Sequence, residues 1–425
     1  VTLSIAMAAE NGYQNIEDCI REGVTLKAGD KVYAQYMNKT LALFHIGTKP
    51  LTEGMNILGA HVDSPRLDVK QNPLYEDTQM AYLDTHYYGG VKKYQWVTIP
   101  LAIHGVVVKK DGTVVPVVIG EKEDDPVFVI CDLLIHLSQD QLEKKARIVI
   151  KGEGLDLLVG KKPVKNADKD EKEKVRAWVV CYLKEAYDIE EEDFLSAELE
   201  IVPSGKSRDC GFDRSMILGY GQDDKVCALT SLFAMLEAES PERTGCCILA
   251  DKEEIGNMGA TGMQSSFFED MVAEVLALTG EDSPVKVRRV LRNSCMLSSD
   301  VSAAYDPLYP EVFEKKNTAY FGRGLVLNKY TGSRGKNGTS DANAEYVAKV
   351  RNVFDNNHVA FQTAELGKVD QGGGGTIAYV MANKAMSVID SGVAVLSMHA
   401  PYEVTSKSDI YEVYRGYKAF LKDMK

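Results

Sequence analysis

An acidic run that follows an apolar segment is the first feature of the sequence that could do chemistry. Residues 246–250 carry no charge, which is typical of a strand buried on both faces. Asp251, Glu253 and Glu254 follow within four residues. Crowding carboxylates beside a buried strand is unfavourable unless a cation lies among them, or one carboxyl stays protonated for proton transfer. A solvated acidic loop is the alternative interpretation, so other ligand-type residues must decide between the two.

Four more His and Asp residues occupy comparable positions. His61, Asp300 and His399 follow the strands expected at 56–60, 294–297 and 394–396, and Asp223 stands at the start of an expected helix. Taken singly, each His could be structural and Asp223 could be a helix cap. The ends of strands in an open α/β sheet converge on one crevice. Together with Glu254, these residues therefore suit a site for two divalent cations.

Five short motifs in this order resemble the aspartyl aminopeptidase family of metallopeptidases. The resemblance covers nearly the whole chain. Any one motif is weak, whereas the five in sequence are highly specific. The motifs are Gly59-Ala60-His61-Val62-Asp63-Ser64-Pro65-Arg66-Leu67, Asp223-Asp224, Glu253-Glu254-Ile255-Gly256, Ser299-Asp300 and Ser397-Met398-His399. The run His86-Tyr87-Tyr88-Gly89-Gly90 also resembles the segment that leads into that family's inserted domain.

The resemblance implies a ligand set for two divalent metal ions per subunit. His61 and Asp300 would bind one ion, Glu254 and His399 the other, and Asp223 would bridge them. The family points to zinc as the cofactor. Histidine and carboxylate ligands also accept cobalt or manganese, so the sequence does not choose among these metals.

The resemblance also implies three residues that act beside the metals. Asp63 would orient His61, and Glu253 would be the general base and then the general acid. His136 lies in an Ile-His-Leu context of the inserted domain, and in the family such a His reaches the active site of a neighbouring subunit. Residues 132–133 depart from the family's usual sequence, so a structural His on an apolar stripe stays open for His136.

The elements expected around these residues give an α/β fold with an insertion. Alternating strands and helices indicate a mixed sheet flanked by helices, of the zinc-peptidase type. From residue 92 to 208 the sequence is β-rich, with a hairpin signal at Lys110-Asp111-Gly112. We therefore expect a catalytic domain at 1–91 and 209–425, interrupted by an inserted dimerisation domain at 92–208. Helical spacing is expected at 2–20, 31–38 and 166–193.

Composition limits the partners and the compartment. The net charge of −13 argues against nucleic acid, because phosphates would be repelled. No apolar run reaches the roughly 18–20 residues that a membrane span needs. The eight cysteines form no C-x-x-C pair, so we expect them to be reduced and the protein to be cytoplasmic.

The sequence therefore predicts a metal-dependent aminopeptidase that acts on peptides and prefers acidic N-terminal residues. Lys329, Arg334 and Lys336 could supply the cation that such a residue needs. An apolar or broad preference stays open, as do an amidohydrolase or deacylase on the same scaffold and a catalytically silent assembly or cargo protein. Family dimers build a hollow dodecamer, so a homo-oligomer is expected.

Overall fold

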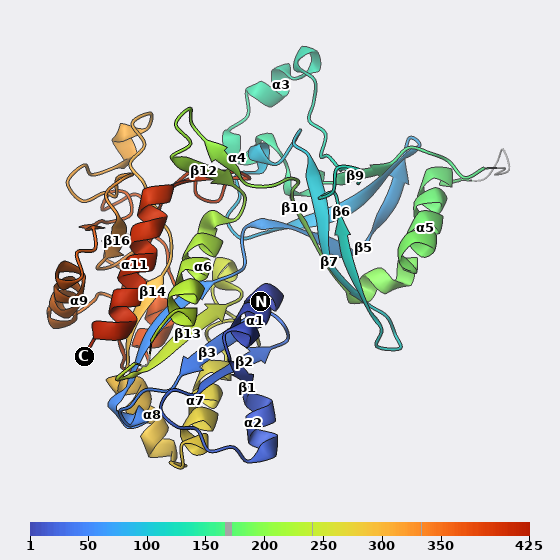
Figure 1. Cartoon of the computed structure of the whole chain (residues 1–425). Coiled ribbons are helices and arrows are strands. Elements are labelled where there is room, and N and C mark those ends of the chain that lie inside the picture. The colour runs from blue at the N-terminus through green and yellow to red at the C-terminus, as the bar shows by residue number, and fades with distance from the viewer. Residues whose placement is uncertain (166–171, 240, 333) are drawn as a thin grey trace. The chain divides into compact units, whose positions relative to one another are not determined.

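The computed structural model describes residues 1–165, 172–239, 241–332 and 334–425, which form two compact units (Figure 1). The first unit comprises Val1–Ser64, Asp209–Met398 and Glu403–Lys425, and the second comprises Pro65–Arg208 and His399–Tyr402. The sequence predicted that the second unit begins at residue 92, whereas in the structure it begins at Pro65. The reason is that β5 (Arg66–Asp77) and β6 (Met80–Tyr88) pair with each other and with strands of the second unit.

A mixed nine-stranded sheet forms the middle of the first unit. Its order is β1 (Gln14–Asn15), β2 (Lys31–Tyr36), β3 (Thr40–His45), β13 (Thr244–Ala250), β4 (Met55–His61), β14 (Cys295–Ser299), β18 (Ser387–Gly392), β16 (Leu325–Asn328) and β17 (Phe361–Thr363). The helix expected at 31–38 is wrong, because Lys31–Tyr36 pairs antiparallel with β3 and alternately buries Val32 and Ala34. Pairing in the sheet outweighs the weak helical spacing of this segment.

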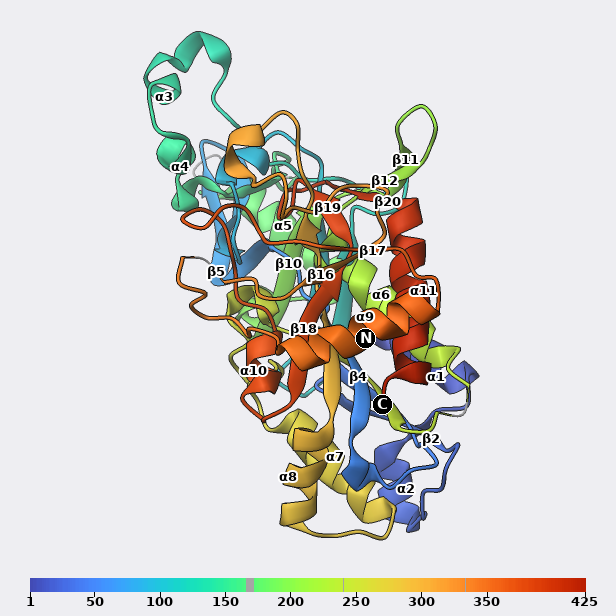
Figure 2. The same ribbon diagram turned by 90° about the vertical axis from the view of Figure 1, so that its left-hand side faces the viewer.

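Helices cover both faces of this sheet. One set is α1 (Thr2–Glu10), α6 (Gln222–Leu236), α9 (Ala344–Asn356) and α11 (Lys407–Asp423), and Figure 2 shows α9 and α11 on their side of the strands. The other set is α2 (Ile16–Glu22), α7 (Phe267–Leu278), α8 (Pro284–Asn293) and α10 (Ala378–Ala382). Along β13, Cys247 and Leu249 pack with the first set, and Cys246 and Ile248 with the second. Alternation along a strand thus gives two cores and the predicted α/β fold.

A smaller sheet completes the first unit. Its strand order is β11 (Arg208–Cys210), β12 (Met216–Gly219), β20 (Glu403–Ser406), β19 (Ala394–Leu396) and β15 (Ser302–Ala303). β12 leads into α6 and β20 leads into α11, so this sheet fixes where both helices begin.

The second unit is β-rich, as predicted, and is built on a six-stranded antiparallel sheet. The order is β8 (Val114–Ile119), β7 (Leu101–Val108), β10 (Ala197–Pro203), β5, β6 and β9 (Leu157–Gly160). The short helices α3 (Gln139–Leu142) and α4 (Ala146–Val149) lie between β8 and β9 in the chain. The helix expected at 166–193 is observed as α5 (Lys174–Tyr187), and residues 166–171 lie outside the described part of the chain.

The cysteines agree with the expectation that they are reduced. All eight are free thiols, and five of them are buried: Cys19, Cys227, Cys246, Cys247 and Cys295. In the described part of the chain, no helix is long and apolar enough to cross a membrane.

Candidate metal centre

The candidate site forms where neighbouring parallel strands of the large sheet end. β4 lies between β13 and β14 and runs parallel to both, with His61 opposite Ala250 and Gly59 opposite Ser298. The residues that follow these three strands therefore leave the sheet at one edge. This topology brings the acidic turn after β13 and Asp300 after β14 to the end of β4, where His61 lies.

Four of the five predicted ligands converge at this edge. Ligand atoms of His61, Asp223 and Glu254 lie within 4.8 Å of one another, and so do those of His61, Asp224 and Asp300. The Nε2 atom of His61 is 3.2 Å from Oδ1 of Asp223. His61, Asp223 and Asp224 are almost completely buried. One imidazole and several carboxylates around a single point form a donor set that fits zinc or a similar divalent ion.

The electrostatics of the cluster indicate an excess of negative charge. Burial raises the pKa of Asp300 well above its ordinary value, and the nearby Asp224 carboxylate raises it further. Burial by itself would lower the pKa of His61, but hydrogen bonds to Asp223 and Asp63 raise it well above 6.5. Both shifts show that the cluster attracts positive charge. Cations among the carboxylates would satisfy this demand better than protons on single side chains.

Asp63 connects the end of β4 to the acidic turn. Its carbonyl oxygen lies 3.0 Å from Nδ1 of His61, so Nδ1–H donates there and Nε2 faces Asp223. Its carboxylate accepts the N–H groups of Glu253 at 3.1 Å and of Glu254 at 3.2 Å. Asp63 thus orients the imidazole through its carbonyl oxygen and anchors the turn that carries both glutamates through its carboxylate.

A tight turn directs the two adjacent glutamates differently. Glu253 and Glu254 begin the 3₁₀ helix η6 (Glu253–Ile255), which lies between Lys252 and Gly256, both in the left-handed region. Glu254 offers a ligand atom to the cluster, whereas Oε2 of Glu253 lies 3.9 Å from Nε2 of His61. Asp251, which received no role from the sequence, accepts a hydrogen bond from Thr261 at 2.6 Å and pairs with Lys252. It therefore fixes the loop that follows the turn.

His399 and His136 belong to the second unit and are not among the converging groups. Nδ1 of His399 lies 2.9 Å from the carbonyl oxygen of Gly90, which leaves Nε2 as the nitrogen that such a His usually offers to a metal. His136 lies in the 3₁₀ helix η3 (Ile135–Leu137), where its neighbours Ile135 and Leu137 are both 68% exposed.

Sequence reasoning missed two buried acids beside the cluster. Asp224 accepts the backbone N–H of His61 at 3.3 Å through Oδ2, and Oδ1 has no nitrogen or oxygen donor among the described residues. Glu403 accepts the N–H of Asp223 at 3.0 Å. The adjacent pair Asp223-Asp224 could have indicated that Asp224 is also part of the site. Glu403 belongs to no such motif, so no sequence pattern indicated it. Asp223 and Asp224 have non-helical backbone angles at the start of α6, and the cap interpretation of Asp223 stays a prediction.

Comparisons with known proteins agree with this geometry. The model of the aminopeptidase I zinc metalloprotease (M18) family matches residues 4–421. An M18 family aminopeptidase of Clostridium acetobutylicum is 61% identical over 423 residues, covering 100% of this chain and 90% of the relative.

Solved structures give the same result. A Thermotoga maritima M18 aminopeptidase superimposes with a TM-score of 0.94 at 45% identity, covering 99% of this chain and 91% of its own. A Saccharomyces cerevisiae relative solved as a dodecamer has a TM-score of 0.79 at 20% identity, covering 100% of this chain and 92% of its own, and shows the fold alone. The chain therefore belongs to the M18 family of zinc metallopeptidases and is an aminopeptidase, as the motifs around His61 and Glu253 predicted.

Proposed function

We propose that the protein removes N-terminal residues from peptides with the help of two metal ions. The observation that carries this proposal is the convergence of His61, Asp223, Glu254 and Asp300 at one sheet edge, beside Glu253. Two overlapping ligand groups exceed the three protein ligands usual for a single catalytic zinc. The two groups have only His61 in common, and together they offer enough donors for a pair of ions.

The proposed ligand assignment follows the sequence motifs. His61 and Asp300 would hold one ion, Glu254 and His399 would hold the other, and Asp223 would be shared. The burial of His61 and Asp223 supports this assignment, because buried charges persist where they are paired or bind metals. The Nδ1 contact between His399 and Gly90 is also that of a ligating histidine.

The proton chemistry falls to Glu253. Two bound zinc ions supply an acidified water and an electrophile for the peptide carbonyl. Glu253 lies at the edge of the cluster, where its carboxylate can accept a proton from water and return it to the leaving amine. The carboxylate of Asp63 accepts the backbone N–H of Glu253 and so holds Glu253 in place. The carbonyl oxygen of Asp63 keeps the proton of His61 on Nδ1. Nε2 of His61 is therefore the nitrogen that would bind a metal ion.

The preference for acidic residues depends on a basic region of the first unit. Arg334, Lys336 and Lys368 line a pocket of about 210 Å³, together with Tyr330 and Glu365. Lys336 and Lys329 both pair with Asp341, and Lys336 also lies over the Tyr330 ring. Residue 333 lies outside the described part of the chain. Because Lys329 and Lys336 already pair with Asp341, we assign recognition of an acidic side chain to Arg334.

A panel of aminoacyl chromogenic substrates tests the function and its specificity. We expect chelator-sensitive release from aspartyl and glutamyl substrates, restored by zinc, cobalt or manganese, and no release after N-acetylation. Arg334→Ala should weaken kcat/KM for the acidic substrates while sparing leucyl and alanyl ones, with Lys206→Ala, an exposed change elsewhere in the chain, as the control. Faster release of leucine than of aspartate would favour an apolar preference. Hydrolysis of the acetylated substrate would favour the amidohydrolase, and no release after metal loading would favour a silent assembly protein.

We also propose that the protein is a cytoplasmic homo-oligomer. Its free cysteines suit a reducing compartment, and exposed Leu134, Ile135 and Leu137 form an apolar stretch of the kind that covers a partner. The S. cerevisiae relative assembles as a dodecamer, and mass photometry of this protein tests the same stoichiometry here.

A further inference from the structure

A hollow of about 500 Å³ is lined by residues of α5 and of the sheet of the second unit. Its floor includes Ile103 and Ile119, which face each other across β7 and β8, and Leu199 of β10. Its roof comes from α5, where Trp178 and Tyr182 are stacked with ring centroids 5.5 Å apart. The floor and the roof are both apolar, so the hollow occupies the place where a small domain normally closes its core.

The size of the hollow indicates that it is not a packing defect. Protein interiors are packed as densely as organic crystals, with few voids larger than a water molecule. Water gains little by entering an apolar cavity, because it finds few partners for its hydrogen bonds there. Pockets of about 300–1,000 Å³ lined mostly by apolar and aromatic side chains are the usual form of small-molecule sites. A ligand with a large apolar body would fill this one.

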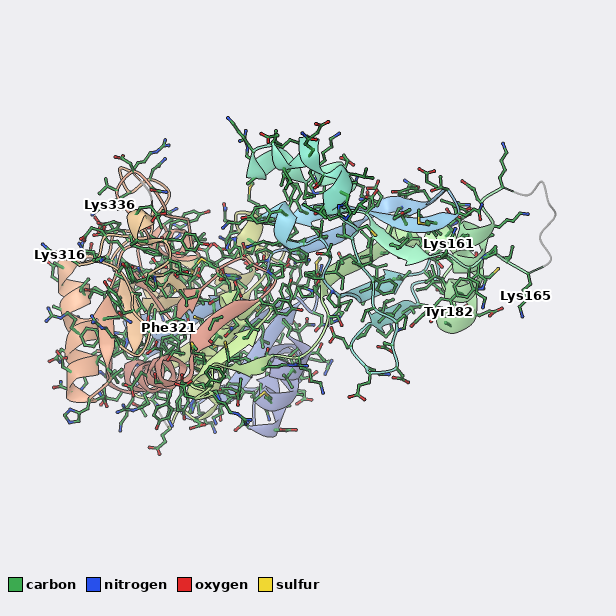
Figure 3. All side chains as sticks on the ribbon, turned by 90° about the horizontal axis from the view of Figure 1, so that it is seen from above. Lys161, Lys165, Tyr182, Lys316, Phe321 and Lys336 are labelled. Atoms are coloured by element: carbon green, nitrogen blue, oxygen red, sulfur yellow. The ribbon has the colours of Figure 1, made fainter. Side chains whose placement is uncertain are left out.

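Charge at one end of the hollow defines the rest of the ligand. Lys161 is the only charged residue among the described residues that line the hollow, and no carboxylate lines it. Figure 3 labels Lys161 and Tyr182, which both line it. The adjacent Lys162 holds its ammonium 5.0 Å from the centre of the Trp178 ring. Two exposed lysines at the rim of an apolar hollow complement a ligand with a single negative end.

We propose that this hollow binds an elongated apolar molecule with one anionic group, of the class of a single-chain alkyl carboxylate. The chain lies between α5 and the sheet, and the carboxylate lies at Lys161 and Lys162. Every residue involved belongs to the second unit, and none is a proposed ligand or catalytic residue. The binding is therefore independent of peptide hydrolysis and can be measured without it.

The chain provides its own reporter for this binding. It contains two tryptophans, of which Trp178 lines the hollow, while Trp96 is completely buried and does not line it. Bromododecanoate, whose bromine quenches indole fluorescence on contact, should therefore quench Trp178 saturably in the assembled wild-type protein. The variant Trp178→Phe should keep its remaining fluorescence unquenched. Unsaturable quenching, or equal quenching in Trp178→Phe, would overturn the proposal.

Two kinds of variant test the apolar chain and the anionic end separately. Val179→Phe fills the hollow and should weaken binding about tenfold or more, which corresponds to about 1.4 kcal/mol. Because this variant could disturb folding, the double change Lys161→Glu and Lys162→Glu gives a surface test. It should weaken binding about fivefold or more at low salt and less at high salt, whereas Lys144→Glu, on an exposed residue elsewhere in the unit, should not. Unchanged binding in the lysine variant, or equally tight binding of dodecylamine, would refute the anionic end.

The remaining outcomes concern other occupants. If a second copy of the chain covers the hollow, the assembled protein will not bind bromododecanoate while a dissociated form will, which overturns the proposal. Stronger quenching by vesicles of brominated anionic phospholipid than by the free acid would assign the surface to a membrane and would likewise overturn it. Saturable binding of the free acid, with little quenching by vesicles, supports it.

Discussion

The two units place charged and apolar groups in opposite ways. The first unit buries His61, Asp223 and Asp224 at the edge of its sheet, although each of these groups prefers water. The second unit exposes Ile135 and Leu137, which prefer an interior. Each arrangement is unfavourable in an isolated chain. The difference fits the proposals that cations bind in the first unit and that an apolar partner covers part of the second.

Glu253→Gln tests most directly whether the buried cluster is catalytic. Removing the carboxylate while keeping its shape should lower kcat by about 10²–10⁴-fold, because general acid–base catalysis contributes that much. Zinc content should stay the same, since Glu253 is not a proposed ligand. Turnover of aminoacyl substrates and zinc per subunit by mass spectrometry measure both quantities.

The matched control for Glu253→Gln is Glu22→Gln, an exposed change at the end of α2. It should leave both turnover and zinc unaffected. A Glu253→Gln enzyme with normal turnover would remove Glu253 from the chemistry, and loss of zinc in that variant would make Glu253 a ligand instead.

Glu254→Gln separates the two glutamates of the turn. It should weaken zinc binding itself by more than the roughly 10–100-fold typical of partners that only orient a ligand. The reason is that a charged ligand atom is lost from the His61 and Asp223 group. Competition with a chromophoric chelator measures this affinity without any turnover. Zinc affinity equal to that of the wild type would break the division of roles between Glu253 and Glu254.

The sequence predicted most of the buried site because strand ends can be read from it. β13 and β4 are short apolar runs, and the polar residues after them had to meet if the strands were parallel neighbours. Glu403 could not be predicted, since its contact with Asp223 depends on the smaller sheet that brings β20 to the start of α6. The helix expected at 31–38 failed for a similar reason, because pairing with β3 is a long-range effect.

The second unit was less predictable, because its hollow is a space between elements and not a pattern of residues. The β-rich character of the unit followed from its sequence, but the hollow beside Trp178 depends on how α5 packs on the sheet, which no local pattern records. The unit also starts at Pro65 and not at the expected residue 92, because β5 and β6 pair with strands of the second unit. Helical spacing at 166–193 predicted α5 itself and not how it packs on the sheet.

Asp224→Asn sharpens the account of the buried cluster. Asparagine keeps an oxygen that can accept the N–H of His61, and removes only the charge. If Asp224 adds to the negative field that holds the cations, zinc affinity should fall by about 10–100-fold, and kcat should recover at saturating zinc. The control is Asp18→Asn, an exposed residue of α2. Unchanged zinc affinity would mean that Asp224 only shapes the backbone at His61.

His136→Ala should have the smallest effect on turnover of these variants. It tests the exposed apolar segment of the second unit. We expect about a tenfold loss of kcat, at the low end of what positioned side chains contribute, with zinc content unchanged. Unchanged turnover would remove His136 from the mechanism.

A mixture of His136→Ala and Glu253→Gln chains distinguishes a role in a neighbouring subunit from a role within one chain. If His136 serves a neighbour, hybrid oligomers contain sites with both residues intact, and exchange of subunits restores part of the activity. If it acts within its own chain, no hybrid site is complete and the mixture stays as slow as its parents. An exposed histidine between two exposed apolar side chains is suited to the first outcome, because docking of Ile135 and Leu137 on another chain would carry the imidazole with them.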